Sequence, residues 1–260
     1  MNIGIFQFSI NKNIDVNFAK IKTCIIEAKS KNVDLLLFHE CALTGYPPTE
    51  IASIEDVNFI RVNEILDELK CICNDTKINI IVGTALKISN IIHNSLCFIK
   101  DDNSEVEYYH KRALWGWDAD NFTEGDLIGV FNIKNFRFGV RICFEVRFPE
   151  YFRELYKQRV DFCFIAFCDH QEKENVGRYN LIMSHIVTRA VENCFPILTA
   201  NSITNFQTAP SCVVDSDGSI VSELRRNKEE LLIYDFEKTE MNFGRLGRET
   251  FSRKLTTAST

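Results

Sequence analysis

The pattern of apolar and polar positions in the first half of the chain predicts strands alternating with helices. Residues 3–8 form a short apolar run suited to a buried strand, and helical spacing of apolar residues follows over residues 18–28. The run VDLLLFHE predicts a second strand that ends at Glu40. The following CALTGYPPTE is predicted to be a loop because one glycine and two prolines interrupt it. Helical spacing returns over residues 59–69, and INIIVGTAL and IIHNSLCFIK predict two more strands.

The second half of the chain repeats this alternation and then becomes rich in predicted strands. We expect a strand pair in GVFNIKNFRFGVRIC, a helix in PEYFRELYKQR, a strand in DFCFIAFC and a helix in RYNLIMSHIVTRAVEN. FPILTANS, APSCVVD and SIVSEL predict strands around a turn at Asp217 and Gly218, and LLIYDF is expected to close the regular structure. Residues 241–260 are expected to form a C-terminal arm or tail. The whole pattern predicts an α/β fold in a single domain of residues 1–260.

Composition and charge narrow the classes of partner. The chain has 36 acidic and 30 basic residues and a net charge of −6, spread along its length, which argues against binding to nucleic acid or anionic membranes. No segment reaches the roughly 18 consecutive apolar residues of a membrane span, so we expect a cytoplasmic protein. The ten cysteines are scattered, which is typical of free thiols in a reducing compartment. Cys71 and Cys73 lack a matching cluster, so no metal site is predicted.

Three positions could carry chemistry, although each also has a structural interpretation. The strand pattern of FRFGVRIC stops at Cys143, just before a predicted helix, where the sulfur could be exposed and the helix dipole could favour its thiolate. Glu40 ends a very apolar run, where desolvation would raise its pKa towards that of a general base. Lys111 could stabilise an oxyanion. Taken singly, Cys143 is more commonly interpreted as a buried structural thiol, and Glu40 and Lys111 as solvated charges.

Four segments together resemble the nitrilase superfamily, or carbon–nitrogen hydrolase family, which is marked by a Glu, Lys, Cys triad. DLLLFHECALTGYPP is similar to the family's apolar strand ending in glutamate, and HKRALWGWDADNFTEGD to its lysine segment. GVRICFEVRFPE is close to its cysteine signature, and TRAVENCFPILTANS to its Arg-Ala-x-Glu-Asn helix and following strand. The resemblance covers nearly the whole chain. It changes our interpretation of Glu40, Lys111 and Cys143 from structural to catalytic.

The resemblance implies a fold, an assembly and a mechanism. The implied fold is a four-layer α-β-β-α sandwich, usually paired through helices into a homodimer or larger homo-oligomer. In the implied mechanism, Glu40 takes the thiol proton as Cys143 attacks an amide carbonyl, and Lys111 and the backbone N–H of Phe144 stabilise the oxyanion. A thioester acyl-enzyme forms and is hydrolysed without a metal or an organic cofactor. Supporting rather than catalytic roles are implied for Arg189, Glu192 and Asn193.

The surroundings of the triad are less well defined by the sequence. Many family members carry a second glutamate near the lysine, but none follows closely after Lys111, so Asp118 or Asp120 could substitute for it or could cap the loop. Arg147 could clamp a substrate carboxylate or form a salt bridge with Glu150. The full set of candidate substrate contacts is Tyr46, Trp115, Arg147, Phe167, Cys168, Asp169 and His170.

The expected substrate is a small linear amide, either an ω-amide of a carboxylic acid or an N-carbamoyl compound, from which ammonia or an amine is released. Nitrile hydrolysis is one alternative. TGYPPTE also resembles the loop in glutaminase domains of NAD synthetases, so supply of ammonia to a partner synthetase is another. A non-catalytic binding protein on the same scaffold and a thiol switch are alternatives of other classes. Iodoacetamide discriminates between these classes, because a catalytic Cys143 should react faster than the other thiols.

Overall fold

The computed structural model describes residues 1–257, and its main strands form two sheets. The first sheet contains β1 (Asn2–Gln7), β2 (Leu35–Phe38), β3 (Asn79–Ile88), β4 (Ile91–Ile99), β5 (Glu107–His110) and β14 (Glu230–Asp235). The second contains β6 (Val130–Ile133), β7 (Phe136–Ile142), β8 (Phe162–Phe167), β10 (Ile197–Asn201), β12 (Cys212–Val214) and β13 (Ile220–Glu223). Their strand orders are β14-β1-β2-β3-β4-β5 and β13-β12-β10-β8-β7-β6. A small ribbon pairs β9 (His170–Gln171) with β11 (Phe206–Gln207).

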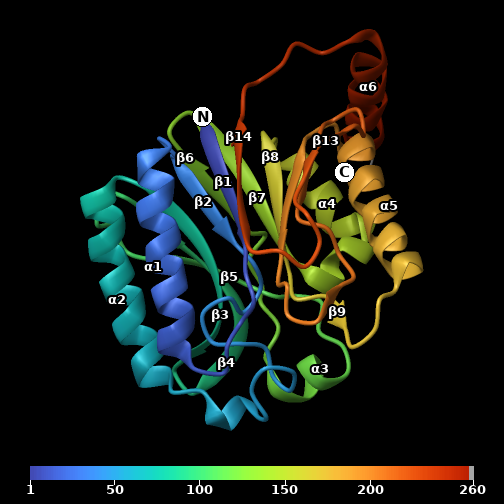
Figure 1. Cartoon of the computed structure of the whole chain (residues 1–260). Coiled ribbons are helices and arrows are strands. Elements are labelled where there is room, and N and C mark those ends of the chain that lie inside the picture. The colour runs from blue at the N-terminus through green and yellow to red at the C-terminus, as the bar shows by residue number, and fades with distance from the viewer. Residues whose placement is uncertain (258–260) are drawn as a thin grey trace.

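Helices cover the outer face of each sheet (Figure 1). The first sheet is covered by α1 (Ile14–Ser30) and α2 (Phe59–Thr76), and the second by α4 (Pro149–Lys157) and α5 (Val176–Asn193). Shorter elements are the 3₁₀ turns η1 (Ile54–Asp56) and η2 (Cys143–Arg147) and the helix α3 (Trp117–Asn121). Of the helices formed by residues 1–257, none combines the length and the apolar character needed to cross a membrane.

The alternation of side chains along the strands creates the layers. Ile3 and Ile5 of β1 join the core between the two sheets, whereas Phe6 packs in the separate core beneath α1 and α2. From the second sheet, Phe138 and Phe162 enter the core between the sheets, with their rings stacked at 5.2 Å. Two sheets packed on one apolar interior, with helices outside, form the four-layer α-β-β-α sandwich that the resemblance implied.

Two glycines allow the chain to approach closely at the segments of interest. A Cβ atom on Gly83 of β3 would lie 2.3 Å from the carbonyl oxygen of His39 and 2.8 Å from the Cα of Glu40. A Cβ atom on Gly125 would lie 2.3 Å from the carbonyl oxygen of His110, next to Lys111. Any side chain at these positions would push the glutamate or lysine segment out of place.

The end of the chain differs from the prediction. Regular structure was expected to close with LLIYDF, but residues Phe243–Thr257 form the helix α6, beside α5 (Figure 1). Asn242 accepts a hydrogen bond from the N–H of Arg245 at 2.8 Å, which caps the start of the helix. Arg248 donates to the carbonyl of Val191 in α5 at 3.2 Å. The predicted tail is therefore helical up to residue 257, and residues 258–260 lie outside the described part of the chain.

Candidate active site

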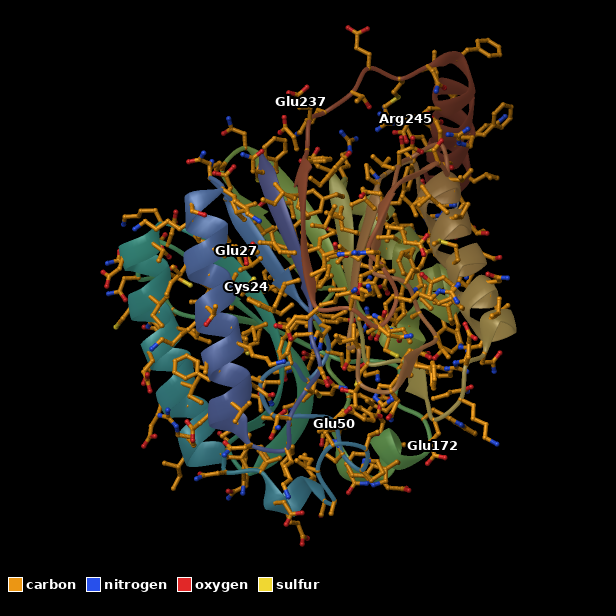
Figure 2. All side chains as sticks on the ribbon, viewed as in Figure 1. Cys24, Glu27, Glu50, Glu172, Glu237 and Arg245 are labelled. Carbon is orange, nitrogen blue, oxygen red and sulfur yellow. The ribbon has the colours of Figure 1, made fainter. Side chains whose placement is uncertain are left out.

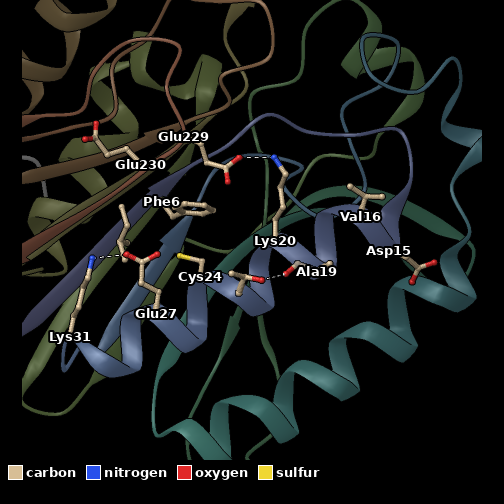
Figure 3. Close-up of a pocket in the computed structure, with 12 residues that line it drawn as sticks. Phe6, Asp15, Val16, Ala19, Lys20, Cys24, Glu27, Lys31, Glu229 and Glu230 are labelled. Carbon is tan, nitrogen blue, oxygen red and sulfur yellow. Dashed lines mark hydrogen bonds and ion pairs between the residues drawn. The ribbon is translucent and has the colours of Figure 1, made fainter.

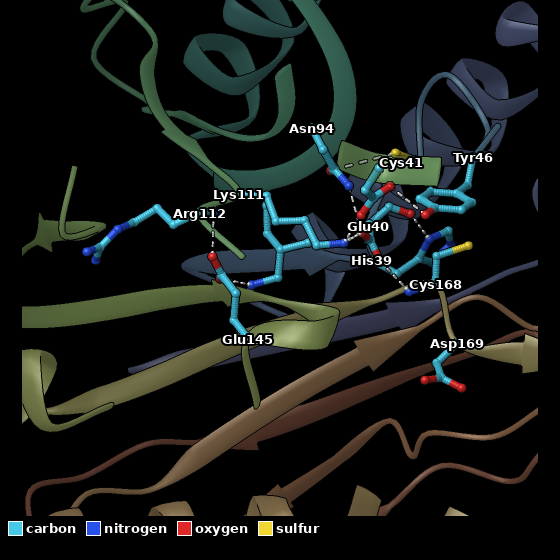
Figure 4. Close-up of polar contacts among 12 residues, drawn as sticks. His39, Glu40, Cys41, Tyr46, Asn94, Lys111, Arg112, Glu145, Cys168 and Asp169 are labelled. Carbon is cyan, nitrogen blue, oxygen red and sulfur yellow. Dashed lines mark hydrogen bonds and ion pairs between the residues drawn. The ribbon is translucent and has the colours of Figure 1, made fainter. Parts of the chain in front are cut away.

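The side chain of Glu40 lies at the centre of a buried polar cluster just beyond the end of β2 (Figure 4). Its Oε1 accepts hydrogen bonds from Lys111 Nζ at 2.9 Å and from Asn94 Nδ2 at 2.7 Å. Its Oε2 accepts from the backbone N–H of Cys168 at 2.9 Å. Because Glu40 follows β2 of the first sheet and Cys168 follows β8 of the second, the carboxylate joins the two sheets where these strands end.

Lys111 follows β5 and lies between two carboxylates. Its Nζ is 2.9 Å from Glu40 and 2.6 Å from Asp118 Oδ2. Asp118 is in turn held by the Tyr46 hydroxyl, which donates to Oδ1 at 2.6 Å. The structure thus brings Asp118 to the lysine, whereas Asp120 is exposed on the short helix α3. Of the two aspartates considered from the sequence, only Asp118 is placed to act on Lys111.

Cys143 stands at an elbow between β7 and the 3₁₀ turn η2. Its φ of +43° lies in the left-handed region, which is rare for a residue with a side chain. The buried Glu145 fixes the turn, because its carboxylate accepts from the N–H of Ile142, the N–H of Arg112 and the hydroxyl of Tyr109, each at 2.7 Å. These three hydrogen bonds to the buried Glu145 therefore hold the elbow in place from the interior of the protein.

The helix that carries the Arg-Ala-x-Glu-Asn sequence also supports this elbow. Arg189 of α5 donates from Nε to the carbonyl of Val146 at 3.0 Å and from Nη2 to the carbonyl of Arg147 at 3.1 Å. Its Nη1 is paired with Glu192 at 2.8 Å. These bonds satisfy carbonyls at the end of the turn that follows the nucleophile candidate. They fit the supporting role that the sequence resemblance implied.

Burial and charge shift the three candidate catalytic groups in different ways. Burial raises the pKa of Glu40, an effect that Lys111 opposes and Asp118 reinforces. Burial alone would lower the pKa of Lys111, but Glu40, Cys143 and Asp118 together raise it well above its usual value. Burial, reinforced by Glu40, raises the pKa of the Cys143 thiol well above 9.0. Desolvation and the adjacent carboxylate thus favour the thiol form of Cys143, contrary to the sequence-based expectation of a favoured thiolate.

A pocket of about 220 Å³ opens onto this cluster. It is lined by Tyr46, Lys111, Trp115, Asp118, Cys143, Phe144, Cys168, Asp169, His170 and Arg178. Trp115 lies at the rim and is 79% exposed. Most of the residues predicted as substrate contacts are therefore in the pocket, and the backbone N–H of Phe144 stays a prediction as an oxyanion donor.

Two predicted substrate contacts are not in this pocket. Phe167 is fully buried in the core between the second sheet and its helices, because its side chain points to the helical face of β8. Arg147 does not line the pocket. Its guanidinium lies over the Phe144 ring at 5.8 Å, and no ion pair with Glu150 is found among residues 1–257. The arginine of the pocket is Arg178, which is paired with Asp169 through Nε and Nη2 at 2.8 and 2.6 Å.

Sequence reasoning missed several residues of the site. Asn94 and Glu145 are held in buried hydrogen bonds. In the sequence, Asn94 stands between the polar residues His93 and Ser95, so nothing marks it as buried. The only signal for Glu145 was that it lies between two apolar residues, which is weak evidence. Glu50 was also missed. It ends the TGYPPTE loop, and its carboxylate is 3.0 Å from His170 Nε2. Together with Cys168, these two residues form a group with the geometry to hold a metal ion.

A larger surface groove lies elsewhere on the molecule, along α1 (Figure 3). Its volume is about 940 Å³, and its walls are mainly charged side chains, including the ion pairs Lys20–Glu229 and Lys31–Glu27 at 2.6 Å each. Burial raises the pKa of its single cysteine, Cys24, so the thiol stays protonated. Figure 2 shows Cys24 and Glu27 on α1, far from Glu50 at the end of the molecule that carries α3. The groove offers no chemistry comparable to the smaller pocket.

Comparison with known proteins agrees with this fold. The family model of the carbon–nitrogen hydrolases matches residues 2–242, and the chain belongs to this family, within the nitrilase superfamily. It is accordingly an enzyme acting on carbon–nitrogen bonds other than peptide bonds.

Particular relatives span most of the chain at low identity. A probable nitrilase from Schizosaccharomyces pombe is 26% identical over 84% of this chain and 81% of its own length. The 2-oxoglutaramate amidase from Bacillus subtilis is 22% identical over 85% of both chains. Among solved structures, an amidase of the nitrilase superfamily from Nesterenkonia superimposes with a TM-score of 0.81 and 18% identity, covering 99% of this chain and 96% of that one. The structural likeness establishes the shared sandwich fold.

Proposed function

We propose that the protein is an amidase that hydrolyses a small linear amide through a thioester on Cys143. The observation that carries this proposal is the position of the Lys111 ammonium, which is held between the carboxylates of Glu40 and Asp118 in the same pocket as the cysteine. A cation and a nucleophile that line one small cavity, with a buried base bound directly to that cation, are the groups that acyl transfer to a thiol requires.

The first step couples proton transfer to attack. Because the pKa of Cys143 is raised, the resting enzyme holds a thiol rather than a thiolate. Glu40, whose own pKa is raised, takes the thiol proton as the sulfur forms a bond to the amide carbon. The carbonyl π electrons move to oxygen, which gives a tetrahedral oxyanion.

Two donors stabilise that oxyanion. Lys111 stays protonated, because its pKa is raised by the flanking carboxylates, and it presents an ammonium to the pocket. The backbone N–H of Phe144 follows the nucleophile at the beginning of η2, where the first N–H groups of a helical turn have no partner within that turn. Glu40 returns its proton to the leaving nitrogen, and the C–N bond breaks with release of ammonia or an amine. Glu40 then activates a water that hydrolyses the thioester to the acid.

The pocket indicates the class of substrate. Its volume of about 220 Å³ is below the roughly 300–1,000 Å³ typical of drug-sized ligands, so only a small acyl group fits. Arg178 lines it and could bind a substrate carboxylate beside Asp169, in the role first considered for Arg147. The Bacillus subtilis relative is named for 2-oxoglutaramate, a compound with an amide and a carboxylate. These features favour an ω-amide or an N-carbamoyl compound of a carboxylic acid.

The test is release of ammonia from a panel of ω-amides, ureido acids, simple amides and nitriles. We expect turnover of one of the first two groups. Cys143→Ala should abolish it while leaving the circular dichroism spectrum and melting temperature unchanged. Cys71→Ala, at an exposed thiol, is the matched control and should retain full activity. Undiminished turnover by Cys143→Ala would disprove the mechanism, and turnover of nitriles alone would replace the amide assignment.

We further propose that the chain functions as a homo-oligomer. The helix α6 leaves the large apolar side chains of Phe243, Leu246 and Phe251 exposed. Large apolar side chains exposed on one helix are typical of an interface between copies. Light scattering coupled to size-exclusion chromatography tests this proposal. We expect at least a dimer for the wild type and a shift toward monomer for Phe251→Asp, whereas a monomeric wild type would refute it.

A further inference from the structure

Beside the pocket lies a group of metal-ligating side chains that the proposed hydrolysis does not use. Glu50, Cys168 and His170 each offer one ligand atom, and these atoms lie within 4.8 Å of one another. The side chains of Glu50 and His170 are 3% and 4% exposed, and their Oε1 and Nε2 atoms are 3.0 Å apart. Two ligands of one tetrahedral ion, each about 2.0–2.2 Å from it, would be separated by only slightly more than this.

Each of the three ligands is anchored by its own backbone segment. Glu50 closes a tight loop, in which its Oε2 accepts from the N–H of Tyr46 at 3.0 Å and its own N–H donates to the Tyr46 carbonyl at 3.0 Å. The N–H of Cys168 is bound to Glu40, and His170 is paired with Gln207 in the β9–β11 ribbon. The three ligand atoms are therefore brought together before any ion binds, which lowers the ordering cost of binding.

The chemistry of this donor set selects a class of ion. A thiolate, an imidazole and a carboxylate are the ligands that zinc uses, and three protein ligands leave a fourth position for water. With Cys168 and Glu50 as anions and His170 neutral, the two negative charges balance a divalent cation. Cys168 and His170 also line the open pocket, which gives an ion a path from solvent.

We propose that Glu50, Cys168 and His170 form a site for a divalent transition cation of the zinc class, and that occupation of this site inhibits the enzyme. On binding, the ion forms bonds to Glu50, to His170 Nε2 and to Cys168 Sγ. The thiol proton leaves to solvent, and the neutral His170 ring carries its one N–H proton on Nδ1. Binding places positive charge within the substrate pocket. It also constrains Cys168, whose N–H holds the carboxylate of Glu40. The inhibitory part of this proposal rests on the proposed amidase function, whereas the binding part does not.

Cobalt(II) is the probe for binding, because a thiolate ligand gives it a charge-transfer band in the near ultraviolet. We expect one Co²⁺ per chain with this band in the wild type and also in Cys143→Ala, which lacks the nucleophile. Cys168→Ser should remove the band and weaken binding by at least about 100-fold, and His170→Asn should weaken it similarly. Glu50→Gln should weaken it by at least about 10-fold. Cys71→Ser is the matched control at an exposed thiol and should bind like the wild type.

Several outcomes would overturn the site. They are the absence of stoichiometric binding to the wild type, a band that survives in Cys168→Ser, or a band that disappears in Cys143→Ala, which would place the ion on the nucleophile instead. Circular dichroism of every variant guards against misfolding. If one ligand variant fails to fold, the other two still decide the question.

Inhibition is measured separately with Zn²⁺ on the active enzyme. We expect ammonia release to fall as Zn²⁺ occupies the site and to recover on addition of a chelator. The half-inhibiting concentration should rise at least about 10-fold in Glu50→Gln. Stoichiometric binding without inhibition would overturn the regulatory part. Binding by a protein that hydrolyses no amide would leave the site intact and refute the proposed function instead.

Discussion

Two buried glutamates flank the elbow at Cys143, and they differ in the partners that satisfy them. Glu145 is 0% and Glu40 is 1% exposed. Within the described residues 1–257, Glu145 accepts only from neutral groups, namely two backbone N–H groups and the Tyr109 hydroxyl. Glu40 accepts from an amide side chain, a backbone N–H and the charged ammonium of Lys111.

This difference separates a structural carboxylate from the proposed catalytic one better than burial does. Within residues 1–257, the partners of Glu145 lie in the segments that it ties together, so the bonds fix the chain on either side of the nucleophile candidate. The partner Lys111 of Glu40 lines the pocket, and Glu40 shifts the pKa of the Cys143 thiol. A carboxylate that exchanges protons needs this access, whereas a positioning carboxylate needs only fixed donors. The comparison predicts opposite consequences for the same chemical change at the two sites.

The largest effect is expected for Glu40→Gln. The amide retains the size of the side chain but cannot take the thiol proton, so kcat should fall by about 10²–10⁴-fold. The melting temperature should change little, because Lys111 keeps its ion pair with Asp118. Ammonia release and thermal unfolding measure the two quantities. Activity within tenfold of the wild type would show that another group is the base.

A slightly smaller effect is expected for Lys111→Met. Loss of the ammonium removes one oxyanion donor, which should lower kcat by about 10²–10³-fold. It also removes the charge that opposes the raised pKa of Glu40 and leaves Asp118, which raises that pKa further. The acid limb of the pH profile of kcat/KM should therefore move to higher pH than in the wild type. If the acid limb does not move, Glu40 is not the group whose titration shapes that limb. The contrast between Glu40 and Glu145 would then fail for Glu40.

Glu145→Gln should reverse the pattern of Glu40→Gln. The NH₂ group of the new side chain faces hydrogen-bond donors and cannot accept from them, so at least one hydrogen bond accepted by Glu145 is lost. This loss should lower the free energy of unfolding by about 1–3 kcal/mol. The melting temperature should then fall by roughly 2–4 °C per kcal/mol. Because Glu145 does not touch the pocket, kcat should change by less than about tenfold. A loss of kcat as large as that of Glu40→Gln, without loss of stability, would refute the distinction.

The contrast between Glu40 and Glu145 also shows what the sequence can predict. Glu40, Lys111 and Cys143 each stand where an apolar strand ends, and strand ends of packed sheets meet at one edge, so their convergence could be inferred from the pattern and the resemblance together. Glu145 lies only two residues from Cys143, yet nothing in FEVR distinguishes a buried acceptor of three hydrogen bonds from a solvated side chain. Its partners are set by distant segments.

Tertiary contacts also explain the two clearest failures of prediction. The glycines at 244 and 247 lower helix propensity, but the residues around them form α6, where Arg248 bonds to the carbonyl of Val191 and pairs with Asp217. Arg147 was one candidate for a substrate clamp, with a salt bridge to Glu150 as the alternative, because it lies four residues after Cys143 in the sequence. The turn η2 directs it away from the pocket, and Arg178 enters the pocket from a distant helix. Closeness along the chain is poor evidence for which charge reaches a pocket.

The smallest effect is a pH dependence of stability that belongs to Glu40. Its raised pKa means that the folded state binds this proton more tightly than the unfolded chain does. The stabilisation from that raised pKa is complete below the unfolded pKa and is lost as the pH rises through the folded pKa. The glutamine side chain of the Glu40→Gln variant does not titrate, so the variant does not lose stability in this way as the pH rises. Its unfolding free energy, relative to that of the wild type, should therefore rise as the pH increases from the unfolded pKa of about 4.3 through the raised folded pKa, by about 1.4 kcal/mol per unit of pKa shift.

Urea denaturation of both proteins across this pH range measures that difference, and every other titrating group common to the two proteins cancels from it to first order. If the difference in unfolding free energy rises with pH, burial destabilises the charged form of Glu40 more than Lys111 stabilises it. A carboxylate in that situation readily accepts the thiol proton. A difference that falls with pH means that the ion pair outweighs burial. Glu40 would then be a poor base held mainly to keep Lys111 in place, and both glutamates would be structural.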